Sequence, residues 1–164
     1  MIRAEAVEAD YRPEPGTAEL LAVPRRGDAG ADAPRPPVAA AAVAADTGID
    51  PSGVANADPR FAAGEAETSR LLVALPGGPR LLVAVASPPP ASTAISSAGR
   101  REALTEAGMA LAQAAPDGGH LAWAADLDPG ELAAVVEGLL IGAHRVDPAA
   151  AETAAAVYTI PVGD

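Results

Sequence analysis

The sequence predicts an α/β fold, a single three-layer domain with a mixed sheet. Short apolar runs typical of buried strands alternate with longer segments in which apolar residues recur at helical spacing. The predicted order along the chain is strand, helix, hairpin, helix, strand and helix, which favours a sheet covered by helices. The 164 residues fit one domain of this kind.

The first half of the chain contains one clear strand and one helix. Residues 20–23 form an apolar run that Pro24 ends, as expected of a buried strand. The alanine-rich residues 38–45 fit either a helix or a buried strand, and Pro37 at a first helical position favours the helix. Residues 1–19, 25–37 and 46–60 show no periodic pattern, so we expect them to be mobile or turn-rich.

The middle of the chain predicts a hairpin and a helix. Two apolar runs, residues 71–75 and 81–85, flank the turn sequence Pro-Gly-Gly-Pro, which is typical of a β-hairpin. Residues 100–115 predict a helix and residues 120–124 a short strand. The helix places four apolar residues on one face, Leu104, Ala107, Leu111 and Ala114.

The best-specified helix covers residues 128–145. Asp128 is placed as its N-cap, with Pro129 as the first helical residue and Glu131 as the third, which is the spacing of a capping box. Gly138 and Gly142 are four residues apart, so they lie on one face. We therefore expect this helix to approach a neighbouring element closely.

Residues 136–147, V-E-G-L-L-I-G-A-H-R-V-D, resemble the helix that closes the N-terminal domain of leucyl (cytosol) aminopeptidases, where E-G-L-L-L-G-x-Y-R-F-D is typical. Residues 61–65 resemble that family's F-x-G-K-x-G-E region, and the predicted strand at 81–85 and helix at 100–115 lie in the family's order. The resemblance implies a macro-domain-like fold over residues 1–147. A linker-like tail would follow at 148–164, although residues 157–160 resemble the opening of a further strand.

The resemblance implies a domain without chemistry of its own. In the family this domain shapes the oligomer, while a separate catalytic domain carries N-T-D-A-E-G-R-L and binds two divalent metals such as Mn or Zn. This sequence has neither that motif nor any lysine, and residues 84–87 and 144–146 depart from the family pattern. No catalytic, cofactor-binding or metal-binding residue is therefore assigned. We expect a non-catalytic domain that forms a homo-oligomer or associates with an aminopeptidase catalytic domain of another chain.

Two alternative functions remain open. A macro-like module could bind a nucleotide such as ADP-ribose at residues 87–91, although prolines remove backbone donors there. Residues 46–50, D-T-G-I-D, resemble the D-T-G-A-D of small aspartic proteases, with Asp46 as the catalytic carboxylate and residues 140–142 as the second glycine motif. An Asx-type turn is the simpler interpretation of Asp46.

The other candidate groups have ordinary structural explanations. The two histidines lack any two-histidine metal spacing, and the second fits the C-terminal end of its helix. Carboxylate pairs arise by chance in so acidic a chain, and Gly77-Gly78 indicates a turn without a following helix. These candidates are His120 and His144, the pair Asp126 and Asp128, and the pair Glu65 and Glu67.

Charge and composition narrow the classes of partner. The formal charge is −11, and a field of that sign repels nucleic acid. The chain has no cysteine, so thiolate sites and disulfides are excluded. Charged residues at positions 3, 5 and 8 do not fit a signal peptide, and no apolar run approaches the roughly 20 residues of a membrane span. We expect a cytoplasmic protein.

Overall fold

The computed structural model describes residues 2–26, 37–89, 95–146 and 156–163. Its strands are β1 (Ile2–Glu8), β2 (Ala18–Val23), β3 (Thr68–Leu75), β4 (Gly78–Ala86), β5 (Gly118–His120) and β6 (Ala156–Val162). Its helices are α1 (Val38–Thr47), α2 (Pro51–Ala57), α3 (Pro59–Ala62), α4 (Ser97–Ala114), α5 (Pro129–Val146) and the 3₁₀ helix η2 (Ala122–Asp126).

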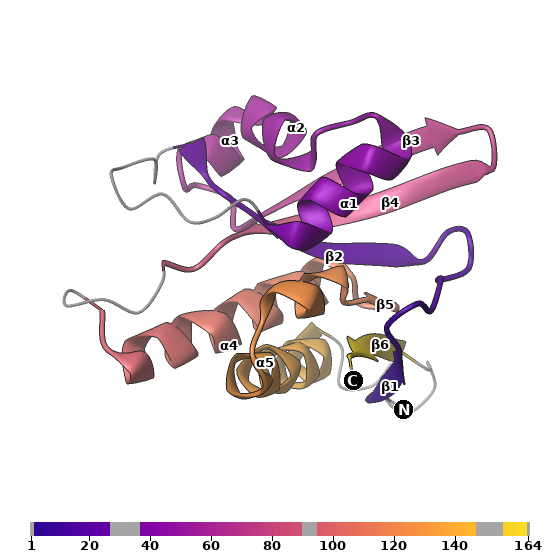
Figure 1. The fold of residues 1–164 in the computed structure, drawn as a ribbon. Coiled ribbons are helices and arrows are strands. Elements are labelled where there is room, and N and C mark those ends of the chain that lie inside the picture. The colour runs from indigo at the N-terminus through magenta and orange to yellow at the C-terminus, as the bar shows by residue number, and fades with distance from the viewer. Residues whose placement is uncertain (1, 27–36, 90–94, 147–155, 164) are drawn as a thin grey trace.

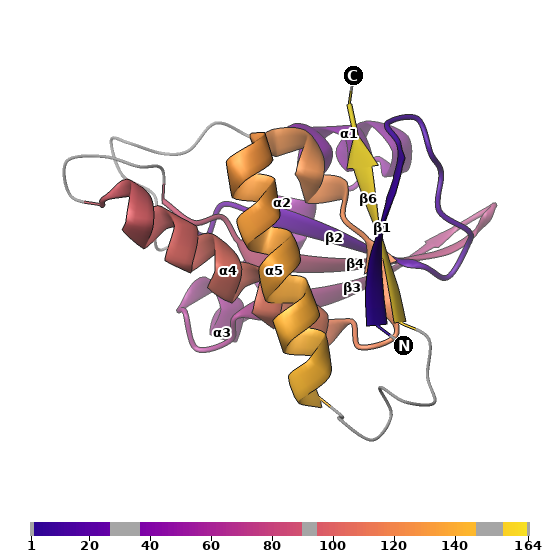
Figure 2. The same ribbon diagram turned by 90° about the horizontal axis from the view of Figure 1, so that it is seen from below.

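The strands form one mixed sheet between two helical layers, which confirms the predicted fold class (Figure 1). The strand order is β1-β6-β5-β2-β4-β3, and only β3 runs antiparallel to its neighbour. Helices α1, α2 and α3 cover β2, β4 and β3 on one face, while α4 and α5 cover the other face (Figures 1 and 2). Helices α1, α2 and α3 do not extend over strands β1 and β6, which lie at the other end of the sheet (Figure 1).

The predicted strand at 20–23, the hairpin and the helices at 38–45, 100–115 and 128–145 are confirmed. Two segments without a periodic pattern also contain regular structure. Strand β1 lies within residues 1–19, and α2 and α3 lie within 46–60. Both short helices begin with an Asp-Pro pair, in which Asp50 accepts a hydrogen bond from the Ser52 amide and Asp58 from the Arg60 amide. Most of 25–37 lies outside the described residues.

The end of the chain differs from the expectation. The strand predicted at 120–124 is wrong, because β5 ends at His120 and a 3₁₀ helix follows. The linker-like tail predicted at 148–164 is wrong for residues 156–162, which form β6 between β1 and β5. The buried Tyr158 hydroxyl donates to the Ala115 carbonyl at 2.8 Å, and burial raises the pKa of Tyr158 to about 12. This hydrogen bond joins β6 to the end of α4.

Helices α4 and α5 pack backbone against backbone. A Cβ atom built on Gly138 would overlap the Thr105 carbonyl oxygen of α4, and one on Gly142 would lie 2.6 Å from the Met109 carbonyl oxygen. Gly108 of α4 makes the reciprocal close contact with the α5 backbone. The predicted close approach of this helix is therefore observed, and α4 is the element that it approaches.

The capping box at the start of α5 is also present. The Glu131 amide donates to Asp128 Oδ1 at 2.8 Å, and the Asp128 amide donates to Glu131 Oε2 at 3.2 Å. The second Glu131 oxygen accepts a hydrogen bond from Arg100 Nε of α4 at 2.7 Å. One carboxylate thus fixes both the start of α5 and its position on α4.

We expect Gly138→Ala to lower the free energy of unfolding by roughly 1–3 kcal/mol, because the added methyl group overpacks the helix contact. This loss exceeds the gain in helix propensity of about 1 kcal/mol. Gly130→Ala is the matched control, since Gly130 is exposed in the same helix and an added Cβ would lie no closer than 3.5 Å to Asp128 Oδ1. Urea melts should show Gly130→Ala at least as stable as wild type. A Gly138→Ala protein of equal stability would contradict the packing.

Candidate functional site

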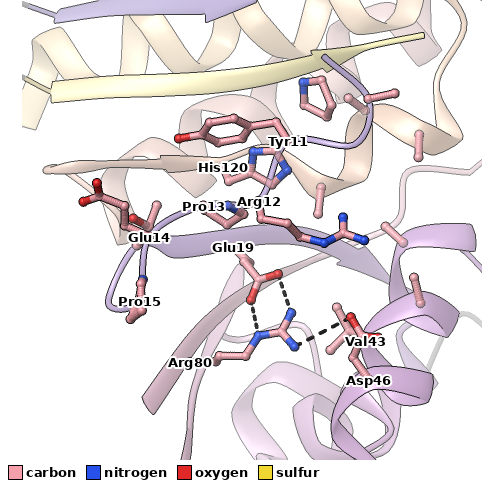
Figure 3. Close-up of a pocket in the computed structure, with 18 of the residues that line it drawn as sticks. Tyr11, Arg12, Pro13, Glu14, Pro15, Glu19, Val43, Asp46, Arg80 and His120 are labelled. Atoms are coloured by element: carbon pink, nitrogen blue, oxygen red, sulfur yellow. Dashed lines mark hydrogen bonds and ion pairs between the residues drawn. The ribbon is translucent and has the colours of Figure 1, made fainter. Parts of the chain in front are cut away.

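A cavity of about 740 Å³ opens on the α1 side of the sheet (Figure 3). Its walls come from α1, η2, the turn of the β3–β4 hairpin and the connection between β1 and β2, residues 9–17. Glu19 enters this cavity because side chains alternate along β2: Leu20 packs into the α4–α5 core, and Leu21 packs on the opposite side with α1. Glu19 is therefore on the α1 face.

Three polar side chains form a row across the sheet at the cavity. Glu19 of β2 is in register with His120 of β5, and His120 is in register with Thr159 of β6. Paired residues on adjacent strands project from the same face. His120 Nδ1 and Thr159 Oγ1 share a hydrogen bond of 2.8 Å. The register of three strands from distant parts of the sequence thus places Glu19 and His120 in the cavity, with Thr159 holding the His120 ring from β6.

An ion pair with two hydrogen bonds joins Glu19 to Arg80 in the cavity. Arg80 donates to both carboxylate oxygens, from Nε at 2.7 Å and from Nη2 at 2.6 Å, and Glu19 is only 7% exposed. Asp46 lies 4.0 Å from the same guanidinium on its outer side. Donating these hydrogen bonds to Glu19 raises the pKa of Arg80, so the guanidinium stays charged. Both carboxylate oxygens of Glu19 are therefore occupied by hydrogen bonds from Arg80.

His120 is the buried titratable group beside this pair. It is 7% exposed, and the Tyr11 ring lies over it with the ring centroids 5.7 Å apart. Burial lowers the pKa of His120; the Glu19 carboxylate opposes this shift and the Arg12 guanidinium adds to it. His120 is therefore neutral near pH 7. Its Nε2 atom has no hydrogen-bond partner among residues 2–26, 37–89, 95–146 and 156–163.

Most of the remaining cavity wall is apolar and built largely from small side chains. These are Val38, Ala39, Ala42 and Val43 of α1, Leu75 of β3, and Ala122, Ala124, Ala125 and Leu127 around η2. The first amides of α1 are already occupied at this wall. Asp126 accepts hydrogen bonds from the amides of Val38 at 2.5 Å and Ala39 at 3.2 Å. The Asp126 carboxylate thus occupies the N-terminal amides of α1, where an anionic ligand could otherwise bind.

The aspartic protease geometry predicted for Asp46 is not present. Asp46 lies in the last turn of α1, Gly48 caps that helix in the left-handed conformation, and Asp50 begins α2. Residues 140–142 lie inside α5. The protease interpretation needs a strand and a loop at both positions, whereas the chain has helices there. The Asx-type turn is found at Asp50, whose side chain accepts from the Ser52 amide.

Of the two histidines, only His120 lines the cavity; His144 is exposed in the last turn of α5. Asp126 and Asp128 serve as helix caps, and Glu65 and Glu67 are exposed before β3. Gly77 and Gly78 line the cavity as part of the hairpin turn. Within the part of the chain that the structure describes, no three His, Cys, Asp or Glu side chains gather as metal ligands would.

The loop predicted for a nucleotide lies away from the cavity. Its described part is residues 87–89, which do not line the cavity, and residues 90–91 lie outside the described residues. The Ser87 amide donates to the Val23 carbonyl, and the carbonyls of Pro88 and Pro89 accept from Arg100. Residues 87–89 thus offer no unused backbone donor to a phosphate.

Sequence reasoning named His120 and Asp46 but missed Tyr11, Arg12, Glu19 and Arg80. One signal was present: Glu19 is the only charged residue in a strand whose other five residues are apolar. A carboxylate at such a position needs a buried partner. The sequence alone does not show that Arg80 is that partner, because the two residues are 61 positions apart.

No family model, curated protein or solved structure matches this chain. None of the helices in the described residues is long and apolar enough to cross a membrane. The site must therefore be interpreted from its own geometry.

We expect acid to destabilise the protein through His120. Because its folded pKa lies below its unfolded pKa, its contribution to stability is complete above the unfolded value and is lost as pH falls through the folded value. The loss is at most about 1.4 kcal/mol per pH unit. Urea melts at about pH 7 and pH 5.5 should show a larger loss in wild type than in His120→Gln. His144→Gln is the control and should behave like wild type; equal losses in all three proteins would refute this origin.

Proposed function

We propose that this chain is a binding domain without a catalytic centre of its own, and that the cavity on the α1 side of the sheet holds a small organic molecule. The observation that carries the proposal is the cavity itself. Its volume of about 740 Å³ lies within the roughly 300–1,000 Å³ of typical ligand sites. An apolar wall with a few convergent polar groups is the usual composition of such sites.

The polar groups favour binding over catalysis. Both oxygens of Glu19 accept hydrogen bonds from Arg80, so this carboxylate is poorly placed to take a proton from a substrate. Nucleophilic catalysis by cysteine or lysine is excluded by composition. His120 retains one ring nitrogen for a ligand, and the Tyr11 ring beside it supplies a flat apolar surface. These groups suit recognition of a ligand's shape and polarity.

The proposal is tested by filling the cavity. Ala42 lines the cavity from an exposed position of α1, so the larger side chain in Ala42→Trp fills part of the cavity without disturbing the core. Ala45→Trp makes the same change at an exposed position of α1 outside the cavity. We expect a set of small aromatic acids, amides and amines to include ligands that shift the amide NMR signals of residues 9–17. Ala42→Trp should abolish these shifts and Ala45→Trp should retain them. Shifts that survive Ala42→Trp would disprove binding in this cavity.

Self-association is a second candidate function, and the edge strand β3 favours it. The strand carries one charged residue, Arg70, and its Leu72 side chain is 68% exposed. Leu72 is in register with the half-buried Leu81 of β4, which extends the apolar surface. Edge strands of monomers usually carry charges or proline that prevent pairing. We propose that β3 pairs with β3 of a second copy. Association with an aminopeptidase catalytic domain, as the resemblance implies, stays a prediction.

We expect the wild-type protein to sediment as a dimer at micromolar concentration and Leu72→Lys to sediment as a monomer. A charge on each edge strand would face its symmetry mate and oppose pairing. Val162→Lys is the control, because Val162 is 45% exposed on β6, which is not an edge strand. Analytical ultracentrifugation distinguishes the two states. A monomeric wild-type protein would dismiss the β3 interface and leave the cavity proposal unaffected.

A further inference from the structure

Arg12 stands apart from the other charged residues of the cavity. It belongs to the connection between β1 and β2, and its exposed side chain extends over the cavity floor near Glu19 and His120 (Figure 3). Arg80 has Glu19 and Asp46 as carboxylate partners. Among the residues that the structure places, no carboxylate forms an ion pair with Arg12. Arg12 is thus a cation at the cavity that forms no ion pair with any carboxylate among the described residues.

We propose that the cavity takes a small organic carboxylate with an apolar body, and that Arg12 receives the carboxylate group next to His120. This inference rests on the proposed binding function and names the class of ligand. A guanidinium matches a carboxylate with two parallel hydrogen bonds. The apolar body would lie against the short side chains of Ala39, Ala42 and Val43. Their small size leaves room for a planar ring.

Other charge classes fit the cavity less well. A phosphate would ordinarily use the first amides of a helix, but Asp126 occupies those of α1 at the cavity wall. The negative charge of Asp126 would also repel a phosphate dianion. A cationic ligand beside His120 would need an unpaired carboxylate there, yet Glu19 and Asp46 both face Arg80. Glu14 lies beside Pro15, away from the Arg12 guanidinium (Figure 3).

The neutral His120 adds a second contact for the ligand. The charged and titratable groups around it are Glu19 from β2 and Arg12 and Tyr11 from the β1–β2 connection, while Thr159 from β6 holds Nδ1. A carboxylate between Arg12 and His120 would weaken the field of Arg12 at the imidazole. Bound carboxylate should therefore raise the pKa of His120, and a neutral ligand of the same shape should not.

The test compares 2-naphthoate with its neutral isostere 2-naphthamide by titration calorimetry, using the full chain. We expect 2-naphthoate to bind more tightly, and Arg12→Gln to weaken it by about tenfold or more while changing 2-naphthamide binding little. Arg101→Gln is the matched control, because Arg101 is exposed on α4, outside the cavity. It removes the same charge and should leave both affinities unchanged.

Proton NMR of the two histidines supplies an independent readout. Saturating 2-naphthoate should raise the titration midpoint of His120 and leave that of the exposed His144 unchanged. Equal affinity for 2-naphthoate and 2-naphthamide, or equal losses in Arg12→Gln and Arg101→Gln, would overturn the carboxylate assignment while leaving a ligand-binding cavity intact. Failure of both probes, together with no hits for any member of the wider ligand set, would overturn the binding function itself.

Discussion

The close contact between α4 and α5 is the constraint on which the rest of the fold depends. The core is rich in alanine, and each alanine removes little apolar area from water, so the helices need many contacts at short range. Gly108, Gly138 and Gly142 allow the two backbones to meet. The larger buried side chains, such as Leu104, Leu139 and Tyr158, then fill the space between this pair and the sheet.

The cavity depends on strand register more than on any local motif. Strand β5 has three residues, and a Cβ built on Gly119 would lie 2.8 Å from the Ala18 carbonyl oxygen of β2. Glycine at this position lets β5 lie between β2 and β6, which places His120 between Glu19 and Thr159. A shift of one residue would turn these polar groups toward the α4–α5 core. The packing of a short, glycine-containing strand therefore decides which side chains face the cavity.

Local signals in the sequence predicted the elements that local physics determines. Apolar spacing predicted α4, and the capping residue Asp128 predicted α5. Strand β1 was missed because it borders the sheet and carries charged residues such as Arg3 and Glu5, which hide the apolar pattern. The cavity could be predicted only through single residues such as His120. Its assembly depends on pairing between strands that are distant in sequence, which no local pattern encodes.

The position of β6 has a consequence for how the protein is made. Strand β1 has β6 as its sheet neighbour, and β5 reaches β1 only through β6. During synthesis the ribosome releases β1 first and β6 more than 150 residues later, at roughly 5–20 residues per second. The amino-terminal strand must therefore wait unpaired for several seconds or longer while the hairpin and the two packed helices form. A nascent chain arrested before β6 would hold a partial sheet of β5, β2, β4 and β3, in which β5 is an unpaired edge strand.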